Sequence, residues 1–102
     1  MSYEKIPLHL NEDQHRFEMN IDGEYAIINY RKTNDVINLI HTEVSEELEG
    51  KGAASALVKK TLKYLEEHQL KMVPSCSYVQ HYLHRHPEWY RIVADKEMPR
   101  MS

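Results

Sequence analysis

Six consecutive residues near the middle of the chain have the composition of a phosphate-binding turn. They are Gly50, Lys51, Gly52, Ala53, Ala54 and Ser55. Small residues at the start of a helix leave backbone N–H groups open to a ligand, and the helix dipole makes this end attractive to anions. Lys51 adds a positive charge. A tight turn that only allows close packing is the alternative interpretation, since the spacing matches neither a Walker loop nor a dinucleotide-binding fingerprint.

Cys76 is the single cysteine and stands where a second helix is expected to begin. The dipole and the free N–H groups at a helix N-terminus favour the thiolate, which is the reactive form of cysteine. The residue is therefore a candidate nucleophile that could form an acyl-enzyme. Many lone cysteines are instead small, buried and inert, and that interpretation stays open.

His41 and Glu43 alternate onto one face of a predicted strand. A histidine that titrates near neutral pH is a natural general base, acting directly or through water. A polar pair on the solvated face of a sheet is the alternative. His81, His84 and His86 also cluster in sequence, but the third points away from the other two and no nearby acid or cysteine completes a tetrahedral site. We therefore expect no metal.

The elements that would position these residues begin with alternating strands. Apolar and polar side chains alternate over residues 15–22 and 24–32, which is typical of strands with one dry face, and residues 36–44 fit a third strand after a turn at residues 33–35. The Asp-Gly dipeptide between the first two segments suits a tight hairpin turn, because both residues tolerate positive φ. Residues 6–10 fit an edge strand, where the proline in that stretch costs no ladder hydrogen bond.

After Gly52 the apolar residues take the period of a helix. Over residues 53–68 the apolar side chains share one arc, and lysines and glutamates occupy the opposite side. Residues 70–73 fit a short strand stopped by a proline. Residues 77–85 fit a second helix, with side chains of residues 75–77 available to cap it. We predict an α+β fold: a mixed, mostly antiparallel sheet with a βαβ crossover and helices packed on it.

Length and charge restrict the class of protein. The chain has 102 residues, with 13 Lys and Arg against 16 Asp and Glu, so its net charge is −3. This balance argues against general affinity for nucleic acid or acidic membranes, and no apolar run could span a bilayer. One cysteine and the absence of a secretory pattern favour a cytoplasmic protein. We expect residues 1–95 to form one domain and residues 96–102 a flexible tail. Nothing in the sequence sets the oligomeric state.

Several short motifs occur in an order that resembles a known family. They are residues 41–44 (HTEV), 50–52 (GKG), 55–58 (SALV), 73–76 (VPSC) and 86–88 (HPE). Together they resemble a small stand-alone subfamily of the GNAT superfamily, the acyl-CoA-dependent N-acetyltransferases, over residues 14–93. Gly52 and Ala54 match the fourth and sixth positions of that family's phosphate loop. Glu49 departs from it, because it stands where glutamine or arginine is usual.

The resemblance implies a fold, a cofactor and a set of roles. Acetyl-CoA would be the co-substrate, with its pantetheine beside the strand at Thr42, Glu43 and Val44. Its diphosphate would lie on the amides of residues 50–55. Cys76 would face the thiol end of the cofactor, and Tyr82 would donate a proton to the departing thiolate.

Three functions are therefore compatible with the sequence. The first is an N-acetyltransferase that acts on an unidentified amine, either a small molecule or an amine of a protein. The second is a non-catalytic module that binds CoA or acyl-CoA. The third is a structural interaction domain whose glycine turn is only a turn. Nucleic acid and membrane partners are not expected for any of them.

Overall fold

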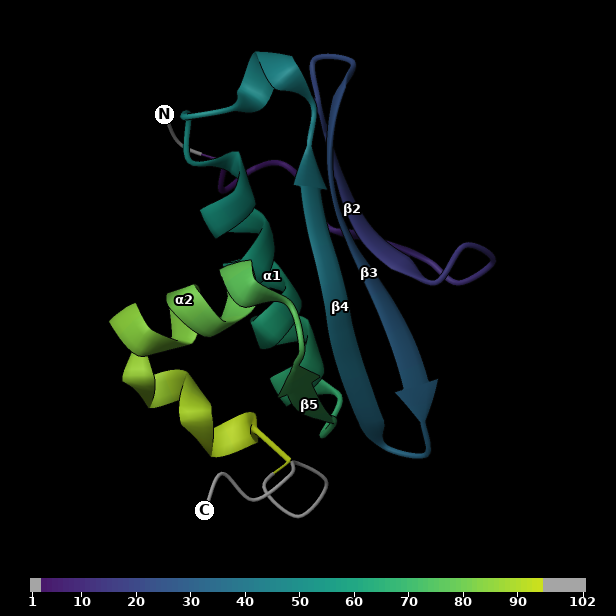
Figure 1. Ribbon diagram of the computed structural model, residues 1–102. Helices are drawn as coiled ribbons and strands as arrows, with labels where there is room; N and C mark the ends of the chain where they lie inside the picture. Colours follow the sequence, from purple (N-terminus) through teal and green to yellow (C-terminus); the bar gives the residue numbers. More distant parts are fainter. Residues whose placement is uncertain (1–2, 95–102) are drawn as a thin grey trace.

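Residues 3–94 are described by a computed structural model in which the helices lie on one face of a five-stranded sheet (Figure 1). The strands are β1 (His9–Asn11), β2 (Arg16–Ile21), β3 (Glu24–Thr33), β4 (Val36–Val44) and β5 (Lys71–Pro74), adjacent in that order. Neighbouring strands are antiparallel except β4 and β5, which are parallel. This arrangement confirms the predicted α+β fold class.

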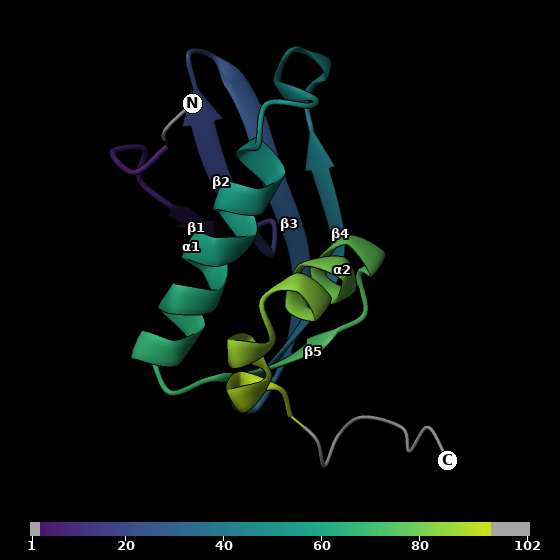
Figure 2. The ribbon, with the colours of Figure 1, turned by 90° about the vertical axis from the view of Figure 1, so that its left-hand side faces the viewer.

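The helices are α1 (Ala53–Glu67) and α2 (Ser77–Arg85), with 3₁₀ turns at Glu46–Leu48 and Pro87–Ile92. Figure 2 views the covered face, with α1 and α2 both in front of the strands. Because α1 links β4 to the parallel β5, the predicted βαβ unit is confirmed. No helix in residues 3–94 is both long enough and apolar enough to cross a membrane.

The core lies between α1 and the covered face of the sheet. The buried residues of α1 include Leu57, Leu62 and Leu65, which follow the helical period predicted from the sequence. They pack with Phe17 and Met19, which alternate along β2 as predicted. The expected hairpin turn between β2 and β3 is confirmed, since both of its central residues have positive φ.

A bulge interrupts the pairing of β3 with β4. Asn29 pairs with His41, but the next residue, Tyr30, pairs with Leu39, so Ile40 is an extra residue on β4. A bulge changes which face the following side chains occupy. Beyond Ile40, the side chain that shares the covered face with Leu39 is therefore that of Thr42 and not that of His41.

Two predictions of local structure are wrong. The edge strand covers only His9–Asn11, later than residues 6–10, because only these residues pair with β2. The cap of α2 is Cys76, whose side chain makes no capping hydrogen bond and instead contacts Thr42. The strand expected at residues 70–73 is confirmed with a shift of one residue, and includes Pro74. The predicted tail, residues 96–102, lies outside the described residues.

Candidate functional site

A cavity of about 360 Å³ lies where β4 ends and α1 begins. Its walls are Thr42 and Val44 from β4, the glycine turn, the first residues of α1, and Tyr78 from α2. The structure therefore brings together the predicted strand segment and the predicted phosphate turn, which are separated in sequence by the 3₁₀ turn. Tyr78 was not predicted, although it stands one helical turn before Tyr82.

The glycine turn leaves its backbone open toward this cavity. Gly50 and Gly52 have φ of 76° and 81°, a region that favours glycine. A methyl group built on either residue would meet no atom within 4 Å, so the space in front of the main chain is free. The first helical hydrogen bond runs from the Ala56 N–H to the Gly52 carbonyl. The amides of residues 53–55 consequently have no acceptor within the helix and can serve an anion.

Tyr3 fixes the back of the glycine turn. Its buried side chain donates a hydrogen bond of 2.8 Å to the carbonyl oxygen of Lys51. A bond to this carbonyl holds the peptide between the two glycines in one orientation. No local pattern predicts this contact, because Tyr3 lies 48 residues from its partner.

Cys76 lies beside β4 where that strand separates from β5. The pairing of the two strands ends at Leu39 and Pro74, and the Cys76 N–H donates to the Leu39 carbonyl at 2.9 Å. The Cys76 Sγ is 3.2 Å from the Thr42 Oγ1, and the residue is only 6% exposed. Beyond this contact β4 continues to Val44 without β5 beside it. The strand edge is thus available to an extended ligand.

Two tyrosines of α2 have different surroundings. Tyr78 is 38% exposed; partial burial raises its pKa, while nearby Arg85 and Ser55 oppose the shift. Tyr82 is buried and its ring stacks on His86 at 4.3 Å between centroids. Burial, and then nearby Glu88, raise the pKa of Tyr82, so its phenol stays protonated at neutral pH. Of the two, Tyr78 is the one that lines the cavity.

His41 and Glu43 lie on the opposite, open face of the sheet. Their side chains are largely exposed, with the His41 Nε2 3.8 Å from the Glu43 Oε1. The Tyr25 hydroxyl donates a hydrogen bond of 3.1 Å to the Glu43 carboxylate. The predicted pairing of His41 with Glu43 on one face is therefore present, but that face is not the one that carries Thr42 and Cys76.

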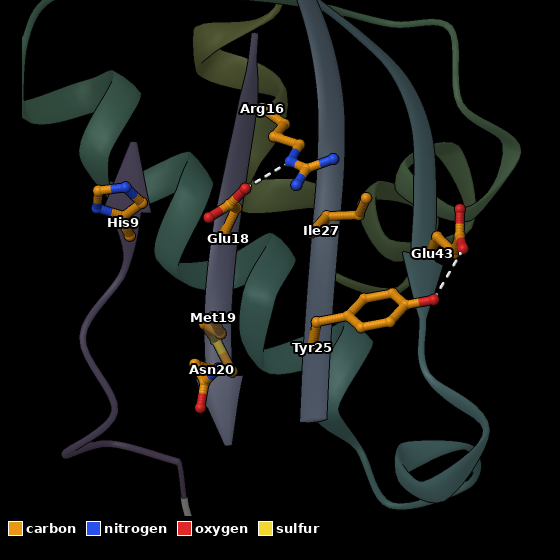
Figure 3. Close-up of a pocket in the computed structure, with 8 residues that line it drawn as sticks. All are labelled: His9, Arg16, Glu18, Met19, Asn20, Tyr25, Ile27 and Glu43. Carbon is orange, nitrogen blue, oxygen red and sulfur yellow. Dashed lines mark hydrogen bonds and ion pairs between the residues drawn. The ribbon is translucent and has the colours of Figure 1, made fainter. Parts of the chain in front are cut away.

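A hollow of about 520 Å³ lies on this open face (Figure 3). Figure 3 shows Tyr25 pointing to Glu43 on one side and Arg16 paired with Glu18 on the other, with Ile27 between them. Burial raises the pKa of Glu18, but its hydrogen bonds from Arg16 and a neighbouring asparagine outweigh this and lower the pKa overall. The hollow offers both charge signs around an apolar floor.

Within residues 3–94 no group of three or more His, Cys, Asp or Glu side chains is placed to hold a metal ion. His81 and His84 are on α2, and His86 follows its end, stacked on Tyr82.

Comparisons with known proteins give a consistent result. The family model of the GCN5-related N-acetyltransferases matches residues 16–93. Protein NATD1 of Mus musculus is 30% identical over 86 residues, which cover 79% of this chain and 78% of that protein. Protein NATD1 of Homo sapiens is also 30% identical, covering 79% and 76%. The solution NMR structure of a GCN5-like protein from Staphylococcus aureus aligns with a TM-score of 0.66 at 29% identity, covering 88% of this chain and 89% of that chain.

Proposed function

This chain belongs to the family of GCN5-related N-acetyltransferases, and on that premise we propose that it transfers the acetyl group of acetyl-CoA to an amine. The observation that carries the proposal is the cavity beside the glycine turn. There, unpaired amides of residues 53–55 adjoin open space in front of Gly50 and Gly52, next to the free edge of β4. A single domain over residues 1–95 and a cytoplasmic location are parts of the same proposal.

The residues around the cavity fit coenzyme A from one end to the other. Of the amides of residues 50–55, those of residues 53–55 would hold the diphosphate, as helix N-termini commonly do, whereas the Lys51 N–H already donates to the Leu48 carbonyl at 3.2 Å. Thr42 and Val44 would line the pantetheine, whose amides can pair with the edge of β4. Cys76 and Thr42 would then adjoin the thioester, because they meet where β4 leaves β5. When bound, acetyl-CoA supplies the activated acyl group.

Acyl transfer to an amine needs two proton movements. The amine nitrogen must lose a proton as the new C–N bond forms, and the sulfur released from the C–S bond must gain one. We assign the first role to His41 or Glu43 on the open face, acting directly or through water. Tyr82 is assigned the second role, with Tyr78 as the alternative because it lines the cavity. Both direct transfer and an acyl-Cys76 intermediate fit these positions.

A non-catalytic module that binds acyl-CoA is the second candidate function. One observation favours it: the candidate base residues and Cys76 lie on opposite faces of the sheet. The two candidates differ in a single property, which is whether an amine accepts the acetyl group.

Two measurements test these functions in sequence. We expect acetyl-CoA well above its Kd to raise the Tm, since a ligand that binds only the folded state stabilises it. Release of free thiol in the presence of a panel of small amines and peptides then distinguishes transfer from binding alone. We expect Cys76→Ala and His41→Ala to reduce thiol release while leaving the thermal shift largely intact. Absence of any shift would refute both functions, and a shift without thiol release would leave only the binding module.

A further inference from the structure

A second cavity, of about 610 Å³, adjoins the glycine turn along the outer side of α1. Its lining comprises Tyr3, Glu4, Gly52, Ala56, Lys59, Lys60 and Lys63. Gly52 also lines the cavity beside β4, so the two cavities meet at the turn. A ligand held on the amides of the turn would therefore extend into one cavity on each side.

The lysines of this cavity form one stripe on α1. Residues 52, 56, 59 and 63 are spaced by three or four positions and so share a face of the helix. Helical side chains lean toward the N-terminus, which brings the ammonium groups of Lys59 and Lys63 back toward Gly52. The backbone of Lys59 is about 10 Å along the helix axis from Gly52, a span that the side chain shortens.

The charge of the cavity is positive although the chain as a whole is acidic. Lys59 and Lys63 are exposed, and Lys60 donates to the carbonyl oxygen of Glu4 at 3.3 Å. Three lysines and one acidic residue, Glu4, thus line this cavity in a chain whose net charge is −3. Such a local excess favours a ligand with more than one negative charge.

Coenzyme A carries this kind of charge next to its diphosphate. Its ribose has a phosphate at the 3′ position, separated from the diphosphate by one sugar. With the diphosphate on the amides of the turn, we propose that the 3′-phosphate occupies the second cavity and pairs with Lys59 and Lys63. This inference rests on the proposed function and adds to it the means by which the protein prefers CoA to ligands that lack the 3′-phosphate.

Isothermal titration with CoA and with 3′-dephospho-CoA tests the inference, because the two ligands differ only in this phosphate. We expect the wild type to bind CoA roughly five- to tenfold more tightly, as exposed ion pairs to a doubly charged group allow. The preference should shrink as salt is added, since salt screens exposed charges. The double variant Lys59→Ala/Lys63→Ala should bind both ligands with the affinity of the wild type for 3′-dephospho-CoA. Alanine favours helix, so α1 should persist.

The control variant is Arg31→Ala/Lys32→Ala, which removes the same charge from exposed residues of β3, outside the second cavity. We expect it to keep the preference for CoA. Equal affinity of the wild type for the two ligands overturns the inference and leaves the proposed function standing. Loss of the preference in the control variant as well also overturns it, since the effect then comes from overall charge. If neither ligand binds, the proposed function falls together with the inference.

Discussion

Substitution of Gly52 by alanine separates the backbone role of the glycine turn from its role toward a ligand. Gly52 has φ of 81° at the start of α1, and a methyl group there would meet no atom within 4 Å. The added methyl therefore causes no clash in the free protein. It does occupy the space in front of the helical amides, where the proposed diphosphate would lie.

The expected magnitudes follow from these two facts. An L-residue in the left-handed region costs about 1–2 kcal/mol relative to glycine. For a domain of this size that lowers the Tm by roughly 5–15 °C. Binding should suffer more, because displacing the diphosphate loses one or two charge-assisted hydrogen bonds of about 1.5–3 kcal/mol each. We expect the affinity for CoA to fall at least roughly tenfold.

Gly23 provides a matched control for the backbone cost. It has φ of 84°, a methyl group on it would also meet nothing within 4 Å, and it lies in the turn between β2 and β3. Gly23→Ala should therefore lose similar stability and bind CoA like the wild type. The assays are urea unfolding and isothermal titration at a temperature where both variants are folded. Equal CoA affinity of the two variants would refute the phosphate role of the turn.

Three further outcomes are expected. Tyr3→Phe should lose about 1 kcal/mol in urea unfolding and weaken CoA binding severalfold, because the Lys51 carbonyl loses its donor; unchanged CoA binding would contradict a role in ordering the turn. Glu18→Gln should be less stable than the wild type by about 0.2–1 kcal/mol at neutral pH, as expected for a pair with Arg16. Since the folded state lowers the pKa of Glu18, this difference should shrink as pH falls below the ordinary value of 4.5 and vanish once pH is below the lowered pKa, and a constant difference would refute the ion pair. Tyr82→Phe should reduce the rate of thiol release more than the affinity for CoA, and an unchanged rate would leave proton donation to Tyr78, which lines the cavity.

The elements with a clear period could be predicted from the sequence. The bounds expected for residues 36–44 and 77–85 agree with β4 and α2, and α1 begins at Ala53 as predicted. The start of α1 could be predicted because its apolar side chains recur with the helical period, and the bounds of α2 because capping residues precede it and a proline follows it. The 3₁₀ turns are too short to show a period, so they could not be predicted. The hydrogen bond from Tyr3 depends on tertiary packing, which no local pattern encodes.

The faces of β4 show why the site was harder to predict than the fold. Strict alternation from Ile37 and Leu39 assigns His41 to the covered face, close to the cleft. The bulge at Ile40 reverses this, and it arises from pairing with β3, while Ile40 itself has the side chain of an ordinary strand residue. The covered face receives Thr42 in its place, in contact with the thiol of Cys76, the N-cap residue of α2.

Beyond the bulge, the two faces of β4 carry different functional groups. Thr42 on the covered side meets Cys76 and the cavity that adjoins the glycine turn, whereas His41 and Glu43 on the open side meet solvent. β5 ends at Pro74, so the edge of β4 beyond Leu39 is the place where groups on the two sides can approach each other. A cofactor held on the covered side therefore leaves the open side for an amine. We infer that the bulge decides which set of side chains meets the cofactor, because without it His41 and Glu43 would lie on the covered face and Thr42 on the open one.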